Sequence, residues 1–304
     1  MDSQDSIEKA AVLALVRHAR AEWYLVSQLL DITGSATRAL LGDWTGFEPE
    51  ELRDSIETQS SIDADLDEYM TMIAALDERG VSVITVLDSD YPSNLRLIYN
   101  RPPFLLVKGT LRPEDDRSIA VVGTRKASEE GLELADRLSR ELATSGVTVI
   151  SGLALGIDGA AHAGALASGG RTVAVVGTGI HRVYPSEHTG LADEIVAAGG
   201  AIVSQFWPDA PPTKWAFPLR NITMSGIAVG TVVVEASNVS GARNQARHAL
   251  EHGKKLFLVE SLVMQEEWAK RYAERPGVRV VTSVDEVISA LDEDLKPAQQ
   301  MTLT

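Results

Sequence analysis

The sequence predicts an α/β protein in which a doubly wound, mostly parallel sheet follows a small helical domain. Its 304 residues are enough for about two domains. Apolar residues recur at helical spacing over residues 7–79. From Val81 onward, short apolar and β-branched runs alternate with helical segments. Strands that alternate with helices imply right-handed crossovers within a parallel sheet.

Residues 1–80 are predicted to form the helical domain. Apolar positions at helical spacing run from Ile7 to Leu30, and the segment Asp31–Gly34 is a helix stop. We expect a loop from Trp44 to Pro49. A further helix is predicted over Asp63–Glu78 because its apolar residues fit one helix face.

Residues 81–292 are predicted to form the α/β domain, and residues 293–304 a polar, frayed tail. Each predicted strand is a short apolar or β-branched run. The strands are expected at Val81–Leu87, Phe104–Val107, Ile119–Val122, Thr148–Ile150, Thr172–Val176, Ala201–Ser204, Thr231–Val234, Leu256–Val259 and Val278–Val281. The helices between and after them are expected at Ser128–Thr144, Gly159–Ser168, Thr189–Ala198, Ala242–His252, Gln265–Glu274 and Val284–Leu291.

Composition excludes several classes of protein. The chain contains no cysteine, which rules out disulfides, thiolate metal sites and cysteine nucleophiles. The segment Met1–Lys9 is acidic and lacks the basic start and apolar run of a secretory signal. No stretch reaches the roughly 18 uninterrupted apolar residues of a spanning helix. We therefore expect a cytoplasmic protein that does not contact a membrane.

The net charge of −15 argues superficially against binding to nucleic acid, but the charge is unevenly distributed. Residues 1–80 hold 6 basic and 17 acidic residues, whereas residues 214–255 hold 6 basic and 2 acidic ones. A local excess of positive charge can bind phosphate whatever the total is. The alternative is a solvated charged face, and charge alone does not decide between the two.

Three strand-to-helix turns are candidate sites, because ligands bind outside the carboxyl ends of the strands in such sheets. The first is Val121–Arg125, in which Gly123 follows a buried strand and Thr124 precedes Arg125. Glycine lets a ligand approach the backbone, amides at the following helix start favour an anion, and an arginine adds donors for phosphate. The alternative is an ordinary tight turn with a surface arginine.

The second turn is Ser151–Asp158, in which Gly152 is one of two glycines. Asp158 could cap the next helix, and His162 follows one turn later on the same face. One interpretation is a phosphate or ribose cradle. The other, which we favour for these two side chains, is a packed turn in which Asp158 and His162 satisfy each other.

The third segment, Lys214–Asn221, is expected to be a loop introduced by Pro208, Pro211 and Pro212. It interleaves Lys214 and Arg220 with Trp215 and Phe217. Single-stranded nucleic acid binds to such patterns, because phosphates pair with cations and bases stack on exposed rings. The alternative is that the two rings are core anchors.

Together these segments resemble the DNA-processing protein A (DprA/Smf) family. Its pattern is Val-Gly-Thr/Ser-Arg, then Ser-Gly-X-Ala-X-Gly-Ile-Asp-X-X-Ala-His, then Lys-X-X-Phe-Pro-X-Arg-Asn, and the order and spacing hold from about residue 83 to 260. The resemblance implies an extended Rossmann-like domain, a homodimer, and a protein that binds single-stranded DNA and helps to load the RecA recombinase. By motif position it assigns DNA contacts to Arg125, Lys214, Phe217 and Arg220, with Asn221 as a weaker candidate.

The sequence also departs from the family pattern. Ile222 stands where the family has a second arginine, and Ala242–Gln245 replaces an apolar run. Val259–Ser261 replaces a Val-Pro-Gly strand end, and the winged-helix extension of many members is not expected here. Arg243 is a candidate replacement for the lost charge. The candidate DNA-binding set is therefore Gly123, Thr124, Arg125, Gly152, Lys214, Phe217, Arg220, Asn221 and Arg243.

A second hypothesis is a nucleotide sensor, or an enzyme like the phosphoribohydrolases of a related Rossmann-like group, with a role in defence. Glu235, at a strand end, is the carboxylate that such chemistry would need. The group's Pro-Gly-Gly-X-Gly-Thr signature is missing, however, so we prefer a buried Glu235 that holds the turn at Ser240 and Gly241.

His248 and His252 have the spacing of a zinc pair but lack an obvious third ligand. We therefore expect no metal, no cofactor and no catalytic residue.

Overall fold

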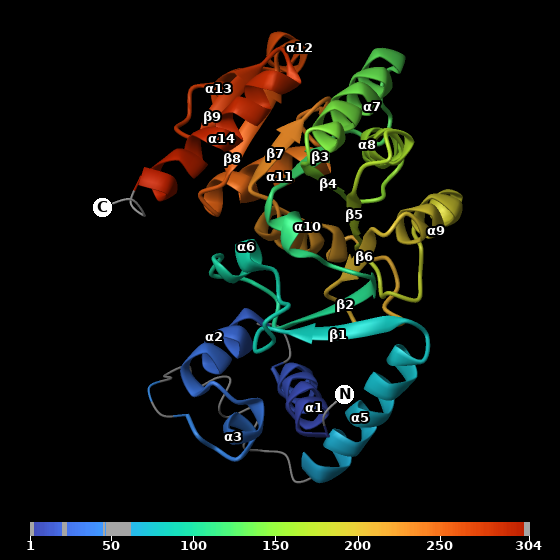
Figure 1. The fold of residues 1–304 in the computed structure, drawn as a ribbon, viewed down its shortest axis with the longest axis vertical. Coiled ribbons are helices and arrows are strands. Elements are labelled where there is room, and N and C mark those ends of the chain that lie inside the picture. The colour runs from blue at the N-terminus through green and yellow to red at the C-terminus, as the bar shows by residue number, and fades with distance from the viewer. Residues whose placement is uncertain (1–2, 20–22, 45, 47–61, 301–304) are drawn as a thin grey trace.

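The computed structural model describes residues 3–19, 23–44, 46 and 62–300, and it contains one nine-stranded sheet with the order β1-β2-β6-β5-β4-β3-β7-β8-β9 (Figure 1). Strands β3 to β9 run parallel to one another, whereas β1 and β2 are added at the β6 edge through antiparallel pairings. The prediction of a doubly wound, mostly parallel sheet is therefore confirmed.

The strands match the predicted runs to within two residues at each end. They are β1 Val81–Thr85, β2 Phe104–Gly109, β3 Ser118–Val122, β4 Thr148–Ser151, β5 Thr172–Val175, β6 Ala201–Ser204, β7 Gly230–Val233, β8 Lys255–Val259 and β9 Val278–Val281.

The helices agree less well with the predictions. They are α1 Ser3–His18, α2 Trp23–Thr33, α3 Ala36–Leu40, α5 Ile62–Asp77, α6 Ser93–Arg96, α7 Glu129–Thr144, α8 Ile157–Ala167, α9 Thr189–Ala197, α10 Ala216–Ile227, α11 Gly241–Glu251, α12 Glu260–Gln265, α13 Glu267–Ala273 and α14 Val284–Gln300, with 3-10 turns at Pro113–Asp116 and Ser186–His188.

Four predictions of local structure need correction. The predicted helix from Ile7 to Leu30 is two helices, α1 and α2. The predicted helix Gln265–Glu274 is interrupted at Glu266, whose backbone is extended, so that α12 and α13 are separate. Helix α14 continues past Leu291 to Gln300, where a frayed tail was expected. Most of the loop expected from Trp44 to Pro49 lies outside the described residues.

The fourth correction concerns the segment expected to be a loop around Phe217, which is the first turn of α10. Three prolines precede it and Pro218 is the third residue of the helix. Proline is tolerated in the first turn because the backbone N–H that it lacks has no partner within the helix there. The three earlier prolines therefore lie in the loop before α10, and Pro218 is compatible with the first turn of that helix.

Both faces of the parallel sheet are covered. In β3, Ile119 and Val121 face α7 and α8, whereas Ala120 and Val122 face the core shared with α10 and α11. All four side chains are buried, which explains why these four residues form an uninterrupted apolar run.

The N-terminal helices cover the antiparallel end of the sheet. Helices α1 and α5 pack against β1, and the ring of Trp23 from α2 lies 5.7 Å from that of Phe104 in β2. These helices lie at the opposite end of the molecule from α7 and α12 (Figure 1). Among the described helices, none combines the length and apolar character that crossing a membrane would require.

Candidate functional site

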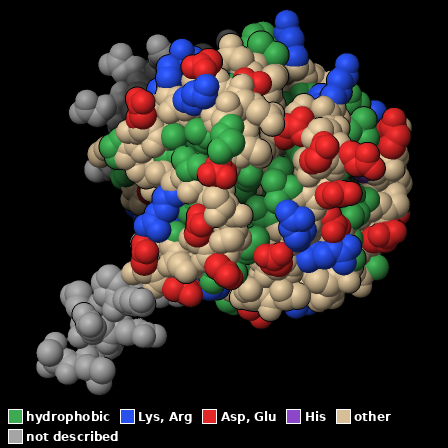
Figure 2. Space-filling model, turned by 90° about the horizontal axis from the view of Figure 1, so that it is seen from above, with side chains coloured by type: hydrophobic (Ala, Val, Ile, Leu, Met, Phe, Trp, Pro, Cys, Tyr) green, Lys and Arg blue, Asp and Glu red, His purple; other side chains and the backbone are tan. Residues whose placement is uncertain are grey.

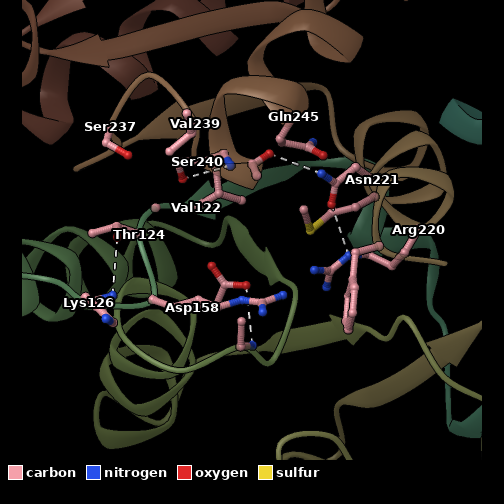
Figure 3. Close-up of a pocket in the computed structure, with 17 residues that line it drawn as sticks. Val122, Thr124, Lys126, Asp158, Arg220, Asn221, Ser237, Val239, Ser240 and Gln245 are labelled. Carbon is pink, nitrogen blue, oxygen red and sulfur yellow. Dashed lines mark hydrogen bonds between the residues drawn. The ribbon is translucent and has the colours of Figure 1, made fainter. Parts of the chain in front are cut away.

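A cavity of about 450 Å³ opens at the carboxyl ends of the parallel strands, where the strand order reverses between β3 and β7. Such switch points are where open α/β sheets bind ligands. Figure 3 shows Thr124 and Lys126 on one side of the cavity and Arg220 and Asn221 on the other. The cavity is lined by Val122, Gly123, Thr124, Arg125, Lys126, Ala154, Asp158, Phe217, Arg220, Asn221, Met224, Ser237, Val239, Ser240, Gly241, Ala242 and Gln245. Six of the nine predicted residues are among them.

The turn after β3 is held by Glu235. The N–H of Thr124 donates to the Glu235 carbonyl at 2.6 Å, and the Ser128 N–H and hydroxyl donate to the carboxylate at 3.0 and 2.9 Å. The Ser128 hydroxyl also accepts the N–H of Gly131, so that Ser128 caps α7. Glu235 is half-buried and supports this turn, rather than the turn at Ser240 that we expected. Glu235 follows β7, which lies beside β3 in the sheet, and this pairing of strands brings its carboxylate to the turn after β3.

Gly123 is required by close packing. A Cβ atom at this position would collide with the side chain of Ile157 and lie 2.9 Å from the Glu235 carbonyl oxygen. The glycine thus lets the turns after β3, β4 and β7 meet.

Two exposed cations, Arg125 and Lys126, stand at the cavity's mouth. The guanidinium carbon of Arg125 lies 4.9 Å from the centroid of the Phe217 ring. The same ring is 5.8 Å from the ring of Tyr184, and a Cβ at Gly177 would lie 2.7 Å from its Cδ1 atom. Phe217 is therefore half-buried beneath Arg125, intermediate between a core anchor and an open stacking ring.

Helix α10 presents one face to the cavity. Phe217, Arg220, Asn221 and Met224 lie three or four residues apart and all line it. The helical spacing brings these side chains together in a way that the expected loop would not.

Arg220 is buried, with only 5% of its surface exposed. Its Nη1 donates to the carbonyls of Gly152 and Val175, each at 2.6 Å, and its Nε donates to Asn221 Oδ1 at 3.1 Å. A Cβ at Gly152 would collide with the guanidinium. Arg220 thus connects α10 to the ends of β4 and β5 and forms the cationic floor of the cavity. Gly152 does not line the cavity; it leaves the space that the Arg220 guanidinium occupies.

Asp158 and His162 do not satisfy each other, contrary to the interpretation that we favoured. His162 Nδ1 lies 2.7 Å from Thr172 Oγ1 on β5, and burial lowers its pKa to about 3. Asp158 lines the cavity in the first turn of α8, whose N-cap is Gly156. Burial raises the pKa of the Asp158 carboxyl, against the opposing effect of Arg220. The two side chains share a face of α8, but His162 contacts the sheet, whereas Asp158 lines the cavity.

Lys214 and Arg243 do not line the cavity. Lys214 is exposed at the start of α10. Arg243 donates to the backbone and side chain oxygens of Asn238 in the β7–α11 loop. The structure therefore brings six predicted residues together and leaves Gly152, Lys214 and Arg243 outside.

The prediction missed the far wall of the cavity, formed by the loop after β7 and the start of α11. There the Ser240 hydroxyl accepts the N–H of Ala242 and caps α11. The sequence could have indicated this wall, because the loop follows β7, and ligands bind at the ends of the two strands between which the strand order reverses.

Comparisons with known proteins decide the family. A family model described as DNA recombination-mediator protein A matches residues 82–292. The chain belongs to this family. DNA processing protein DprA of Bacillus subtilis is 33% identical over 229 residues, which cover 73% of this chain and 75% of that protein. Protein Smf of Escherichia coli is 42% identical over 167 residues, which cover 55% of this chain but only 45% of that protein.

Solved structures of the family share the fold. The structure of DprA from Streptococcus pneumoniae has a TM-score of 0.71 at 27% identity and covers 92% of this chain and 97% of that one. The structure of DprA from Helicobacter pylori has a TM-score of 0.61 at 24% identity, covering 70% and 96%. That structure is described by its single-stranded DNA binding mode.

Two departures from the family pattern have structural explanations. Ile222 packs partly buried against the apolar core, on the side of α10 away from the cavity residues. Asn244, in the altered run, accepts a hydrogen bond from Asn221 Nδ2 at 3.3 Å, so that α10 and α11 are joined beside the cavity.

The two histidines at the end of α11 are held by contacts within the protein. The rings of His248 and His252 stack at 5.9 Å, and His252 contacts Ser225 Oγ and Asn100 Oδ1, each at 3.0 Å. Across the described part of the chain, no group of three or more potential ligands could hold a metal ion.

Proposed function

We propose that this chain binds single-stranded DNA in the cavity between β3 and β7 and carries out no chemistry on it. Membership of the family supports the proposal, since its named relatives are DNA processing proteins and the Helicobacter pylori relative is described as binding single-stranded DNA. The observation that carries it is the set of anion-binding groups at one cavity: Arg125 and Lys126 at the mouth, Arg220 at the floor, and the start of α11.

The charge of the residues that line the cavity supports DNA binding better than the charge of the whole surface does. Seen from above, the molecule carries interspersed acidic and basic side chains, with hydrophobic ones gathered between them (Figure 2). The cavity instead combines three cations with a single carboxylate, Asp158. A phosphate would therefore meet a locally positive surface on a protein whose net charge is −15.

The arrangement favours binding that tolerates different base sequences. Cations and helix-start amides bind phosphate oxygens, which carry no sequence information. Each phosphate contact to a single strand lowers the slope of log affinity against log salt by about 0.7.

Fluorescence anisotropy of labelled oligo-dT over a salt series tests the proposal. Arg125→Ala and Lys126→Ala should each weaken binding by about tenfold, because a hydrogen bond to a charged group contributes about 1.5 kcal/mol or more. Arg140→Ala, an exposed arginine near the far end of α7, is the matched control and should bind as the wild type does. Unchanged affinity in both cavity variants would end the assignment.

The position of Glu235 supports binding without catalysis. Its carboxylate accepts hydrogen bonds from Ser128 and stabilises a turn, so it is not free to act as a general base. Incubation with AMP should release no adenine, and release of adenine would favour the phosphoribohydrolase alternative.

The finer roles implied by the resemblance belong to the same proposal. We infer a cytoplasmic homodimer that delivers single-stranded DNA to RecA during processing, recombination or natural transformation. A dimer would place two cavities on one strand and raise the effective affinity. Light scattering of the purified chain tests the dimer, and RecA filament assembly on strands preloaded with this protein tests the partnership.

A further inference from the structure

One tryptophan of this chain differs from the other four in its exposure. Trp44 and Trp268 are buried, and Trp23 and Trp207 pack against the ring of Phe104. Trp215 has 70% of its surface exposed. An exposed indole ring presents a flat apolar face on which a ligand ring can stack.

Trp215 stands at the edge of the proposed DNA site. It is the N-cap residue of α10, and only two positions separate it from Phe217, which limits the distance between their Cα atoms to about 7 Å. Leu219, one turn along α10, is also 47% exposed and extends the apolar surface. The cavity and this surface thus meet at the first turn of one helix.

A cation accompanies the ring. The Lys214 ammonium Nζ lies 5.0 Å from the centroid of Trp215. A lysine is a flexible point charge that can leave the ring for a phosphate. The pair therefore repeats, outside the cavity, the combination of cation and aromatic ring that single-stranded nucleic acid requires.

Phe217 is less suited to stacking than the sequence suggests. Arg125 covers its ring at 4.9 Å, the Gly177 backbone approaches it closely, and Tyr184 lies 5.8 Å away. A base could stack there only after Arg125 moved. Of the two rings in the first turn of α10, that of Trp215 is the open one.

We propose that Trp215 is a base-stacking platform for single-stranded DNA, with Lys214 pairing with a neighbouring phosphate. This inference rests on the proposed function and extends it. A strand whose phosphates meet Arg125 and Lys126 would continue over the start of α10 and place a base on the indole. Every base has a π-face, so the contact adds affinity without selecting a sequence.

Paired oligonucleotides test the stacking. Trp215→Ala should weaken binding to oligo-dT by about 5- to 150-fold, the range expected for one stacked base. Trp215→Phe should recover most of the affinity. On an abasic oligonucleotide of equal length, wild type and Trp215→Ala should bind equally, because no base is present to stack. Leu41→Ala, an 83% exposed apolar residue in the N-terminal helices, is the control.

Fluorescence supplies an independent readout. Oligo-dT should quench the tryptophan emission of the wild type, and Trp215→Phe should lose that change while still binding. The inference is overturned if Trp215→Ala binds oligo-dT like the wild type, or if it weakens binding to both oligonucleotides equally. In either case a loss of binding by Arg125→Ala would leave the proposed function standing, whereas a wild type that binds neither oligonucleotide would refute both.

Discussion

Replacing Arg220 by alanine is expected to destabilise the fold, although its motif position assigns it to DNA. The change would remove three hydrogen bonds from a side chain that is 5% exposed, and two buried carbonyls, of Gly152 and Val175, would lose a charged donor. Leaving one buried group unsatisfied costs about 1–3 kcal/mol. Asp158 would also lose its opposing charge. The two unsatisfied carbonyls together cost about 2–6 kcal/mol, a large part of a typical stability of about 5–15 kcal/mol.

Urea unfolding measures this effect. With a slope of about 3 kcal/mol per molar, the unfolding midpoint of Arg220→Ala should fall by roughly 1 to 2 M. Arg125→Ala is the matched control: its side chain is exposed, and the contact with Phe217 is expected to contribute about 0.5–1 kcal/mol. If the two variants unfold at the same urea concentration, the structural role assigned to Arg220 is wrong.

Three further perturbations follow from close contacts and burial. Gly152→Ala should lower stability about as much as Arg220→Ala in the same urea assay, because the added methyl collides with the guanidinium. Gly131→Ala should cost about 1–2 kcal/mol, since its Cβ would displace the Glu235 carboxylate that supports the α7 cap; an unchanged unfolding midpoint would contradict this. Burial lowers the pKa of His162 to about 3, so its contribution to stability is complete above pH 6.5 and should be lost as the pH falls toward 3, at about 1.4 kcal/mol per pH unit. His162→Asn should show a shallower decline of unfolding free energy over that range.

The sheet could be predicted because its central strands are buried on both faces. The run Ile119–Val122 has no polar residue, and a strand between two helical layers needs none. Helix α10 was missed because proline was taken as a sign of a loop. A single sequence does not show whether Pro218 precedes a helix or lies in its first turn, and only the second is compatible with the observed structure.

The cavity could be predicted only in part. Gly123 and Arg125 follow a strand, and strand ends meet at one edge of a parallel sheet, so their place was predictable. The burial of Arg220 was not, because its acceptors lie 68 and 45 residues away, at the ends of two other strands. Local spacing also misled us on Asp158 and His162, which share a helix face but have different neighbours.

The acidic character of the chain is compatible with an anion site because electrostatic effects in salt are local. At physiological ionic strength charges are screened beyond about 8 Å, so a phosphate in the cavity responds mainly to Arg125, Lys126 and Arg220. The sequence that carries the largest acidic excess is the N-terminal region, and helices α1, α2, α3 and α5 lie at the far end of the molecule from α7 (Figure 1). Their charge would repel a strand that arrives elsewhere on the surface, whereas the start of α10 joins the cationic cavity to the exposed ring of Trp215. The same uneven distribution that makes the net charge misleading would therefore direct a strand toward that one edge of the sheet.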